Sequence, residues 1–216
     1  MAVSYTAIVQ CALGRPCGMS AGDCALRSDL LLSATGLGAI RGERRLYSGV
    51  DIKAGKGDVI LLRGKNGSGK TTLLRQLAGL TECSVGNVSK EVSHHWIGHS
   101  NGLKAHETPR SHLRHWSKVW GANADFDHVI SAMGLARPAD VPARLLSAGQ
   151  KRRTAIGRLK LVERSVWLLD EPFNALDSDG QSLLAEMIET HRAGGGAVIA
   201  ALHGDAPVEA SGEVAL

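Results

Sequence analysis

The chain contains the stretch Gly64-Lys65-Asn66-Gly67-Ser68-Gly69-Lys70-Thr71, and this stretch decides the fold. It matches G-x-x-x-x-G-K-[ST], in which glycines let successive backbone N–H groups point into one hollow that holds phosphate oxygens. We therefore predict that these eight residues and Thr72 bind nucleotide phosphates. Lys70 would reach the β- and γ-phosphates, and the Thr71 hydroxyl would hold Mg²⁺.

The segments on either side of this loop favour a phosphate-binding role. An apolar β-run, Asp58–Arg63, precedes the loop, and a helix with leucines on one face, Lys70–Ala78, follows it. A helix that begins at the loop adds partial positive charge where phosphate would lie. The alternative is a glycine-rich turn that binds nothing, and it does not account for the order strand, loop, helix.

Strands and helices alternate along most of the chain. We predict an α/β fold with a mainly parallel sheet, a small antiparallel β part near the N-terminus, and a helical subdomain at about residues 98–155. The strand predictions are Leu30–Thr35, Arg44–Val50, His94–Ile97, Ser165–Leu169 and Ala197–Leu202. The helix predictions are 109–120, which Thr108 caps, 125–133, 149–162 and 179–192.

Length and composition fit one globular domain. The chain has 216 residues, 44% of them hydrophobic, and its apolar runs are too short for a membrane-spanning helix. A net charge of +4 is too weak to indicate a nucleic-acid partner. The four cysteines form no CxxC pair, which argues against a zinc site. We expect residues 1–28 to be a poorly ordered extension and residues 29–216 to be a single domain.

A second signal is the adjacent carboxylates Asp170 and Glu171, which follow an apolar strand. In an open α/β sheet, ligands bind at the carboxyl ends of the strands. Asp170 suits Mg²⁺, directly or through water, and Glu171 suits a general base that orients water toward the γ-phosphate. Without the phosphate loop, the same pair would be read as a surface helix cap.

A third signal is Leu146-Ser147-Ala148-Gly149-Gln150, which begins a helix and offers a second anion site. Here the sequence resembles the ATP-binding subunits of ABC transporters, whose signature motif is Leu-Ser-Gly-Gly-Gln. Ala175-Leu176-Asp177 resembles the D-loop of that family, and His203 follows an apolar strand where its switch histidine is expected. A simple P-loop kinase has no use for the signature motif.

The resemblance implies an ATP-dependent, head-to-tail homodimer. Each ATP, with Mg²⁺ at Thr71 and Asp170, would lie between the phosphate loop of one copy and the signature motif of the other. The implied catalytic residues are Lys70, Glu171 and His203. The implied binding residues also include Ser147, Gly149, Gln150 and Asp177.

Within the superfamily, the chain most resembles the ATP-binding subunit of the cytochrome c maturation haem exporter. The resemblance lies in Arg41–Arg44, Leu61–Arg75, Leu146–Arg153 and Trp167–Phe173. It implies integral membrane subunits as partners and a peripheral location on the cytoplasmic face of the bacterial inner membrane. Other interpretations stay open: an ABC ATPase for another substrate, a soluble non-transport ABC ATPase, or a nucleotide-binding subunit that does not hydrolyse.

The sequence departs from the family pattern in two places. Family members usually have a glutamine after the strand that follows the phosphate-loop helix, whereas this chain reads Gly98-His99-Ser100-Asn101. Ser100 or Asn101 would then approach Mg²⁺ or its water less directly. No aromatic residue stands where adenine usually stacks, which leaves Ile40 or Arg41 to cover the ring.

Histidines gather between His94 and His128, and His112 and His115 share one basic helix with Arg110, Arg114 and Lys118. Histidine is a common haem ligand. Because charge-rich helices usually lie at the surface, we interpret this region as a solvated face that meets a partner. We interpret Trp116 and Trp120 as packing residues.

Overall fold

The computed structural model describes residues 29–90, 92–204 and 207–216. The predicted extension, residues 1–28, lies outside the described residues. Apart from Asp29 and Leu30, the described residues belong to one compact unit, Leu31–Leu216. The division of that unit into a core and a helical subdomain stays a prediction.

A five-stranded sheet forms the centre of this unit. Its strands run in the order β5 (His94–Ile97), β6 (Val166–Asp170), β7 (Ala197–Ala201), β3 (Val59–Arg63) and β8 (Gly212–Ala215). Every neighbouring pair is parallel, which confirms the predicted parallel sheet. The carboxyl ends of β3 and β6 therefore lie at the same edge, where the phosphate loop and the Asp170-Glu171 pair follow.

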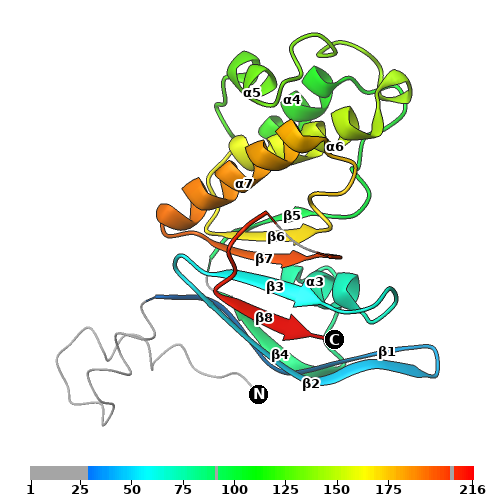
Figure 1. The fold of residues 1–216 in the computed structure, drawn as a ribbon, viewed down its shortest axis with the longest axis vertical. Coiled ribbons are helices and arrows are strands. Elements are labelled where there is room, and N and C mark those ends of the chain that lie inside the picture. Colours follow the sequence, from blue (N-terminus) through cyan, green and yellow to red (C-terminus); the bar gives the residue numbers. More distant parts are fainter. Residues whose placement is uncertain (1–28, 91, 205–206) are drawn as a thin grey trace, which may run out of the picture. The chain divides into compact units, whose positions relative to one another are not determined.

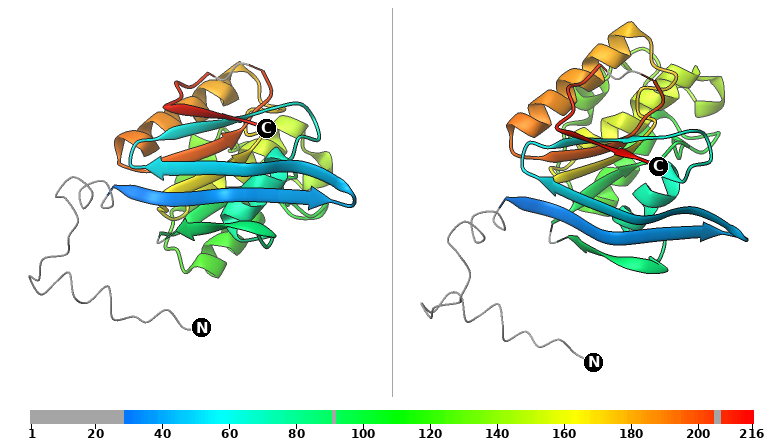
Figure 2. Two further views of the ribbon diagram at one scale, coloured as in Figure 1. Left: turned by 90° about the horizontal axis from the view of Figure 1, so that it is seen from below. Right: turned by 60° about the horizontal axis from the view of Figure 1, so that its bottom comes forward.

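A smaller sheet holds β2 (Arg44–Gly55), β1 (Leu30–Arg41) and β4 (Val85–Lys90) in that order, as Figure 2 shows. β1 and β4 are antiparallel, so the antiparallel N-terminal part is confirmed. β1 and β2 are longer than predicted. The sequence analysis missed β4 and β8, which are edge strands with few buried residues.

The core has two halves, one on each face of the central sheet. In β3, Val59 and Leu61 belong to one cluster of buried side chains, and Ile60 and Leu62 belong to the other. Since side chains alternate across a strand, this pattern means that both faces are covered. Unbroken apolar runs such as Val59–Leu62 are typical of a strand buried in this way.

Helices cover both faces (Figure 1). They are α3 (Lys70–Ala78), α4 (Pro109–Trp120), α5 (Phe126–Ala132), α6 (Ala148–Ile156) and α7 (Ser178–Ala193), with 3₁₀ turns η2 (Ala143–Leu145) and η3 (Gly157–Lys160). α3 has the predicted bounds. The predicted helix 149–162 is wrong at its end, because α6 stops at Ile156 and continues as the 3₁₀ turn η3. None of the described helices combines the length and apolar character that crossing a bilayer requires.

The histidine region is only partly the solvated face that we predicted. His115 is exposed, but His95 and His112 are each 1% exposed. His95 Nε2 lies 2.8 Å from the Val162 carbonyl oxygen, and His112 Nδ1 lies 3.1 Å from Glu107 Oε2. Burial lowers the pKa of His95 to about 4. Trp116 and Trp120 pack together, as predicted, with ring centroids 5.0 Å apart.

Candidate functional site: the phosphate loop and the ends of β6 and β7

The loop between β3 and α3 takes a shape that only glycine allows at two positions. Gly64 has φ +154° and Gly69, the N-cap of α3, has φ +109°. A Cβ on Gly69 would lie 2.8 Å from ring atoms of Tyr47, and one on Gly64 would lie 2.6 Å from Ser68 Oγ. The glycine spacing of the motif thus has a steric cause in this chain.

Two polar side chains are held inside this loop. Lys70 is 6% exposed, and its Nζ donates to the carbonyl oxygens of Gly64 at 2.6 Å and Lys65 at 3.2 Å. The buried Ser68 hydroxyl has no hydrogen-bond partner within the described part of the chain. A buried hydroxyl without a partner is costly unless a ligand satisfies it. Both groups suit phosphate oxygens.

A pair of hard oxygen ligands adjoins the loop. The Thr71 hydroxyl donates to Asp170, with Oγ1 2.9 Å from Oδ2 and 3.2 Å from Oδ1. Asp170 ends β6 and is 2% exposed. Among the described residues, no group of three or more histidines, cysteines or carboxylates could hold a metal. The hydroxyl and carboxylate oxygens of this pair are ligands that suit Mg²⁺, which keeps several waters and takes phosphate oxygens as further ligands.

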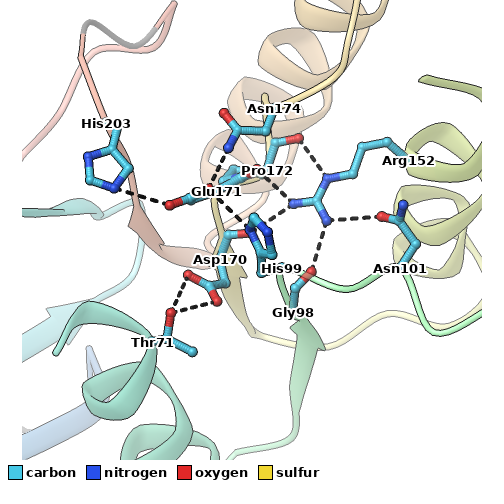
Figure 3. Close-up of polar contacts among 10 residues, drawn as sticks. All are labelled: Thr71, Gly98, His99, Asn101, Arg152, Asp170, Glu171, Pro172, Asn174 and His203. Atoms are coloured by element: carbon cyan, nitrogen blue, oxygen red, sulfur yellow. Dashed lines mark hydrogen bonds and ion pairs between the residues drawn. The ribbon is translucent and has the colours of Figure 1, made fainter. Parts of the chain in front are cut away.

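Glu171 follows β6 in a left-handed backbone conformation, φ +49°, which is uncommon for a non-glycine residue. Its N–H donates to the Ala201 carbonyl at 2.9 Å. His203 Nε2 lies 3.2 Å from Oε1 of this carboxylate, and His99 Nδ1 lies 3.1 Å from Oε2. The Asn174 side-chain amide also donates to Oε2. Figure 3 shows the two imidazoles approaching Glu171 from two sides.

The signature segment forms the start of α6. Ser147 is the N-cap, its hydroxyl accepts from the Gln150 N–H at 3.1 Å, and Gln150 Oε1 accepts from the Ser147 N–H at 3.0 Å. This reciprocal pair is a capping box. A Cβ at Gly149 would lie 2.9 Å from the Ala175 carbonyl oxygen. The segment thus packs against the loop that follows β6.

Replacing Ser147 by alanine is expected to lower the free energy of unfolding by about 1 kcal/mol, because the cap of α6 loses its acceptor. Urea denaturation of the purified chain measures this. Ser131→Ala, at an exposed position in the last turn of α5, is a matched control that should unfold at the wild-type urea concentration. Equal midpoints for all three chains would contradict the capping role.

Asp177 caps α7 and is also held by an arginine of α6. Its Oδ1 accepts from the Gly180 N–H at 3.0 Å and from Arg153. The Arg153 guanidinium holds the pKa of this carboxyl below its usual value. Asp177 of the predicted D-loop therefore contacts α6, the helix that the signature segment begins, within one chain.

The sequence analysis missed the role of Arg152, which is 3% exposed. Its guanidinium donates to the backbone carbonyls of Gly98, Asp170, Glu171 and Pro172 and to Oδ1 of Asn101. We considered Asn101 above as a residue that could approach Mg²⁺. In the structure, its side-chain oxygen accepts a hydrogen bond from Arg152. Three consecutive basic residues, Lys151–Arg153, carried no signal that the middle one is buried.

The fold and the phosphate loop define a P-loop ATPase of the ABC class. A family model described as ABC transporter matches residues 47–174, more than half of the chain. A solved ATP-binding subunit of an ABC transporter aligns with a TM-score of 0.71 and 22% identity, over 80% of this chain and 79% of that one. At 22% identity, this similarity shows a shared fold and no more than that.

Proteins that are similar in sequence identify the family within the ABC class. The cytochrome c biogenesis ATP-binding export protein CcmA of Hyphomonas neptunium is 50% identical over 186 residues, covering 86% of this chain and 96% of that protein. The CcmA of Methylococcus capsulatus is 42% identical over 191 residues, covering 82% and 92%. The chain belongs to this CcmA family of ATP-binding proteins within the ABC transporters.

Proposed function

We propose that this chain is the ATP-hydrolysing subunit of an exporter that acts, with integral membrane subunits, in cytochrome c biogenesis. The observation that carries the hydrolytic part is the contact between His203 Nε2 and Glu171 Oε1, beside the Thr71–Asp170 pair. The role in cytochrome c biogenesis follows from the names of the relatives.

The residues have distinct tasks in this proposal. Glu171 accepts a proton from the water that attacks the γ-phosphate, and His203 holds the carboxylate in position and contacts that phosphate. Lys70 and the N–H groups of the phosphate loop stabilise the charge that develops on the phosphate oxygens. Thr71 and Asp170 would hold Mg²⁺, which neutralises phosphate charge when bound.

A second copy of the chain completes the site in this proposal. The Ser147–Gln150 segment presents a helix N-terminus, which suits an anion, and it would cover the nucleotide held by the phosphate loop of the other copy. ATP would therefore favour dimer formation, and hydrolysis would let the dimer open. That opening is the motion that membrane subunits would use.

The cargo and location extend the same proposal. Haem export, or release of a haem-loaded chaperone, at the cytoplasmic face of the bacterial inner membrane agrees with the relatives' printed role in cytochrome c biogenesis. An ABC transporter for another substrate is the second candidate. A non-transport ATPase is the third, and neither has an observation of its own in its favour.

The test is affinity purification of the tagged full chain from native membranes, with ATP hydrolysis measured on the isolate. We expect integral membrane proteins to co-purify and hydrolysis to require Mg²⁺, so that chelation by EDTA abolishes it. Identification of the partners distinguishes cytochrome c biogenesis from another pathway. An isolate that hydrolyses ATP but brings no membrane protein would refute the transporter role alone.

A further inference from the structure

Glu171 has more polar partners than a single positioning histidine would supply. Three side chains contact its two oxygens: His203 Nε2 lies 3.2 Å from Oε1, His99 Nδ1 lies 3.1 Å from Oε2, and the Asn174 amide donates to Oε2. A carboxylate offers about four acceptor positions. Contacts on both oxygens restrict the orientation of the carboxylate, and an acceptor position is left for the proton of an attacking water.

His99 reaches Glu171 from a different part of the chain than His203 does. It follows β5, whereas His203 follows β7, and β6 lies between these two strands in the sheet. Glu171 directly follows β6, so the imidazoles come from the strands on either side of it. The His99 side chain is 70% exposed, so its contact with Glu171 is not a by-product of core packing.

Arg152 explains why an exposed side chain keeps this position. Nη1 donates to the Gly98 carbonyl at 2.8 Å and to Asn101 Oδ1 at 3.2 Å, on either side of His99. Nη2 donates to the carbonyls of Asp170 at 2.8 Å and Glu171 at 2.9 Å. One planar guanidinium therefore sets the distance between the loop of His99 and the backbone of Glu171 (Figure 3).

We propose that His99 is a second positioning residue for Glu171 and that Arg152 holds the loop of His99 in place. His99, with the proton on Nδ1, donates to Oε2 and prevents the carboxylate from rotating away from the attacking water. The inference rests on the proposed role of Glu171 as general base. It assigns to residues 98–101 a task in orienting that base.

The experiment compares the steady-state kinetics of ATP hydrolysis by full-length variants. His99→Ala is expected to lower kcat about tenfold and to leave KM for ATP within about twofold, because the base is misplaced while nucleotide binding is untouched. His99→Asn places an amide N–H near the position of Nδ1 and should recover most of the loss. His106→Ala removes another exposed histidine of the same region and should match the wild type.

Asn101→Ala tests whether Arg152 holds the loop of His99 in place, and it leaves the buried arginine in the chain. It takes away one of the two contacts between Arg152 and this loop, so kcat should fall about threefold with KM unchanged. A wild-type kcat in this variant would show that the contact between Arg152 and Asn101 does not hold His99 in place. Thermal unfolding of each variant shows whether a loss of kcat reflects a loss of fold.

The outcomes separate this inference from the proposed function. If the wild-type chain hydrolyses ATP, Glu171→Gln does not, and His99→Ala turns over at the wild-type rate, then the inference is wrong and the general base stands. A loss in His99→Ala that His99→Asn does not restore also contradicts the donor role. A wild-type chain that does not hydrolyse ATP overturns both.

Discussion

Glu171→Gln is expected to lower the rate of ATP hydrolysis at least about 100-fold while leaving ATP binding close to the wild-type level. A positioned general base contributes about 10²–10⁴ to a rate, and an amide cannot accept the proton. Glutamine has the shape of glutamate, so the backbone at this strained position, φ +49°, keeps its contacts with Ala201 and Arg152. The loss should therefore fall on kcat.

The hydrogen bonds around residue 171 favour a folded but inactive variant. An amide presents one oxygen and one NH₂ group, whereas the carboxylate accepts from both sides. His203 or His99 can meet the NH₂ group by changing tautomer, because a neutral imidazole has one acceptor nitrogen. We therefore expect unchanged thermal stability together with the loss of turnover.

The measurement is phosphate release under saturating ATP, together with equilibrium binding of a fluorescent ATP analogue. Glu163→Gln, a matched change at an exposed glutamate, should leave both quantities unchanged. Turnover by Glu171→Gln within about tenfold of the wild type would show that Glu171 is not the general base. Loss of binding in that variant would point to a structural role instead.

The central part of the fold could be predicted because local rules and tertiary packing agree there. Gly69 of the phosphate-loop motif precedes α3, and Gly79 ends the helix with the positive φ that is common for a glycine at a helix C-terminus. The predicted bounds of α3 are therefore correct. β7 and the first four residues of β6, Val166–Leu169, are apolar because both faces of the sheet are covered, and the sequence shows this pattern.

The missed elements lack such a local signal. β4 reads Val85-Gly86-Asn87-Val88-Ser89-Lys90, a mostly exposed strand whose pairing with β1 alone makes it a strand. Gly157 follows α6, and the chain continues there as a 3₁₀ turn. A Cβ at Gly157 would lie 3.3 Å from atoms of Leu113 and Met133, so this position is packed by residues distant in the sequence, which periodicity does not reveal.

The placement of the candidate site residues could be predicted where sequence motifs define them, but not where it depends on tertiary contacts. Lys70, Thr71, Asp170 and Glu171 lie at the predicted edge of the sheet, and His203 meets Glu171. His99 was interpreted only as one member of a histidine-rich region. Its contact with Glu171 depends on how the loop after β5 turns, which no residue spacing encodes.

Replacing Arg152 by methionine is expected to lower the free energy of unfolding by about 3–5 kcal/mol, the largest loss of stability that we predict. Its five N–H groups meet five oxygens, of which four are backbone carbonyls at the ends of β5 and β6. Methionine fills a similar volume and donates to none of them. For a domain of this size, the loss corresponds to a fall in Tm of roughly 6–20 °C.

Two effects oppose each other at this position. Burial of the guanidinium is itself costly and lowers the pKa of Arg152 to about 10. The carboxylates of Asp170 and Glu171 act in the opposite direction and raise this pKa. Removing a buried charge therefore relieves part of the desolvation cost. We expect the cost of the unsatisfied carbonyls to exceed the desolvation cost that is relieved. Several buried carbonyls lose a donor together, and each unsatisfied group costs about 1–3 kcal/mol.

Two arginine variants of α6 make the measurement decisive. Arg152→Lys keeps the charge but has three donors for five acceptors, so its Tm should lie between those of the wild type and Arg152→Met. Arg153→Met removes an arginine whose partner, Asp177, is 68% exposed, and should lower Tm much less than Arg152→Met does. If Arg152→Met unfolds at the wild-type temperature, the guanidinium does not hold the ends of β5 and β6 together. The position of His99 beside Glu171 would then need another cause, and Asn101→Ala should leave kcat unchanged as well.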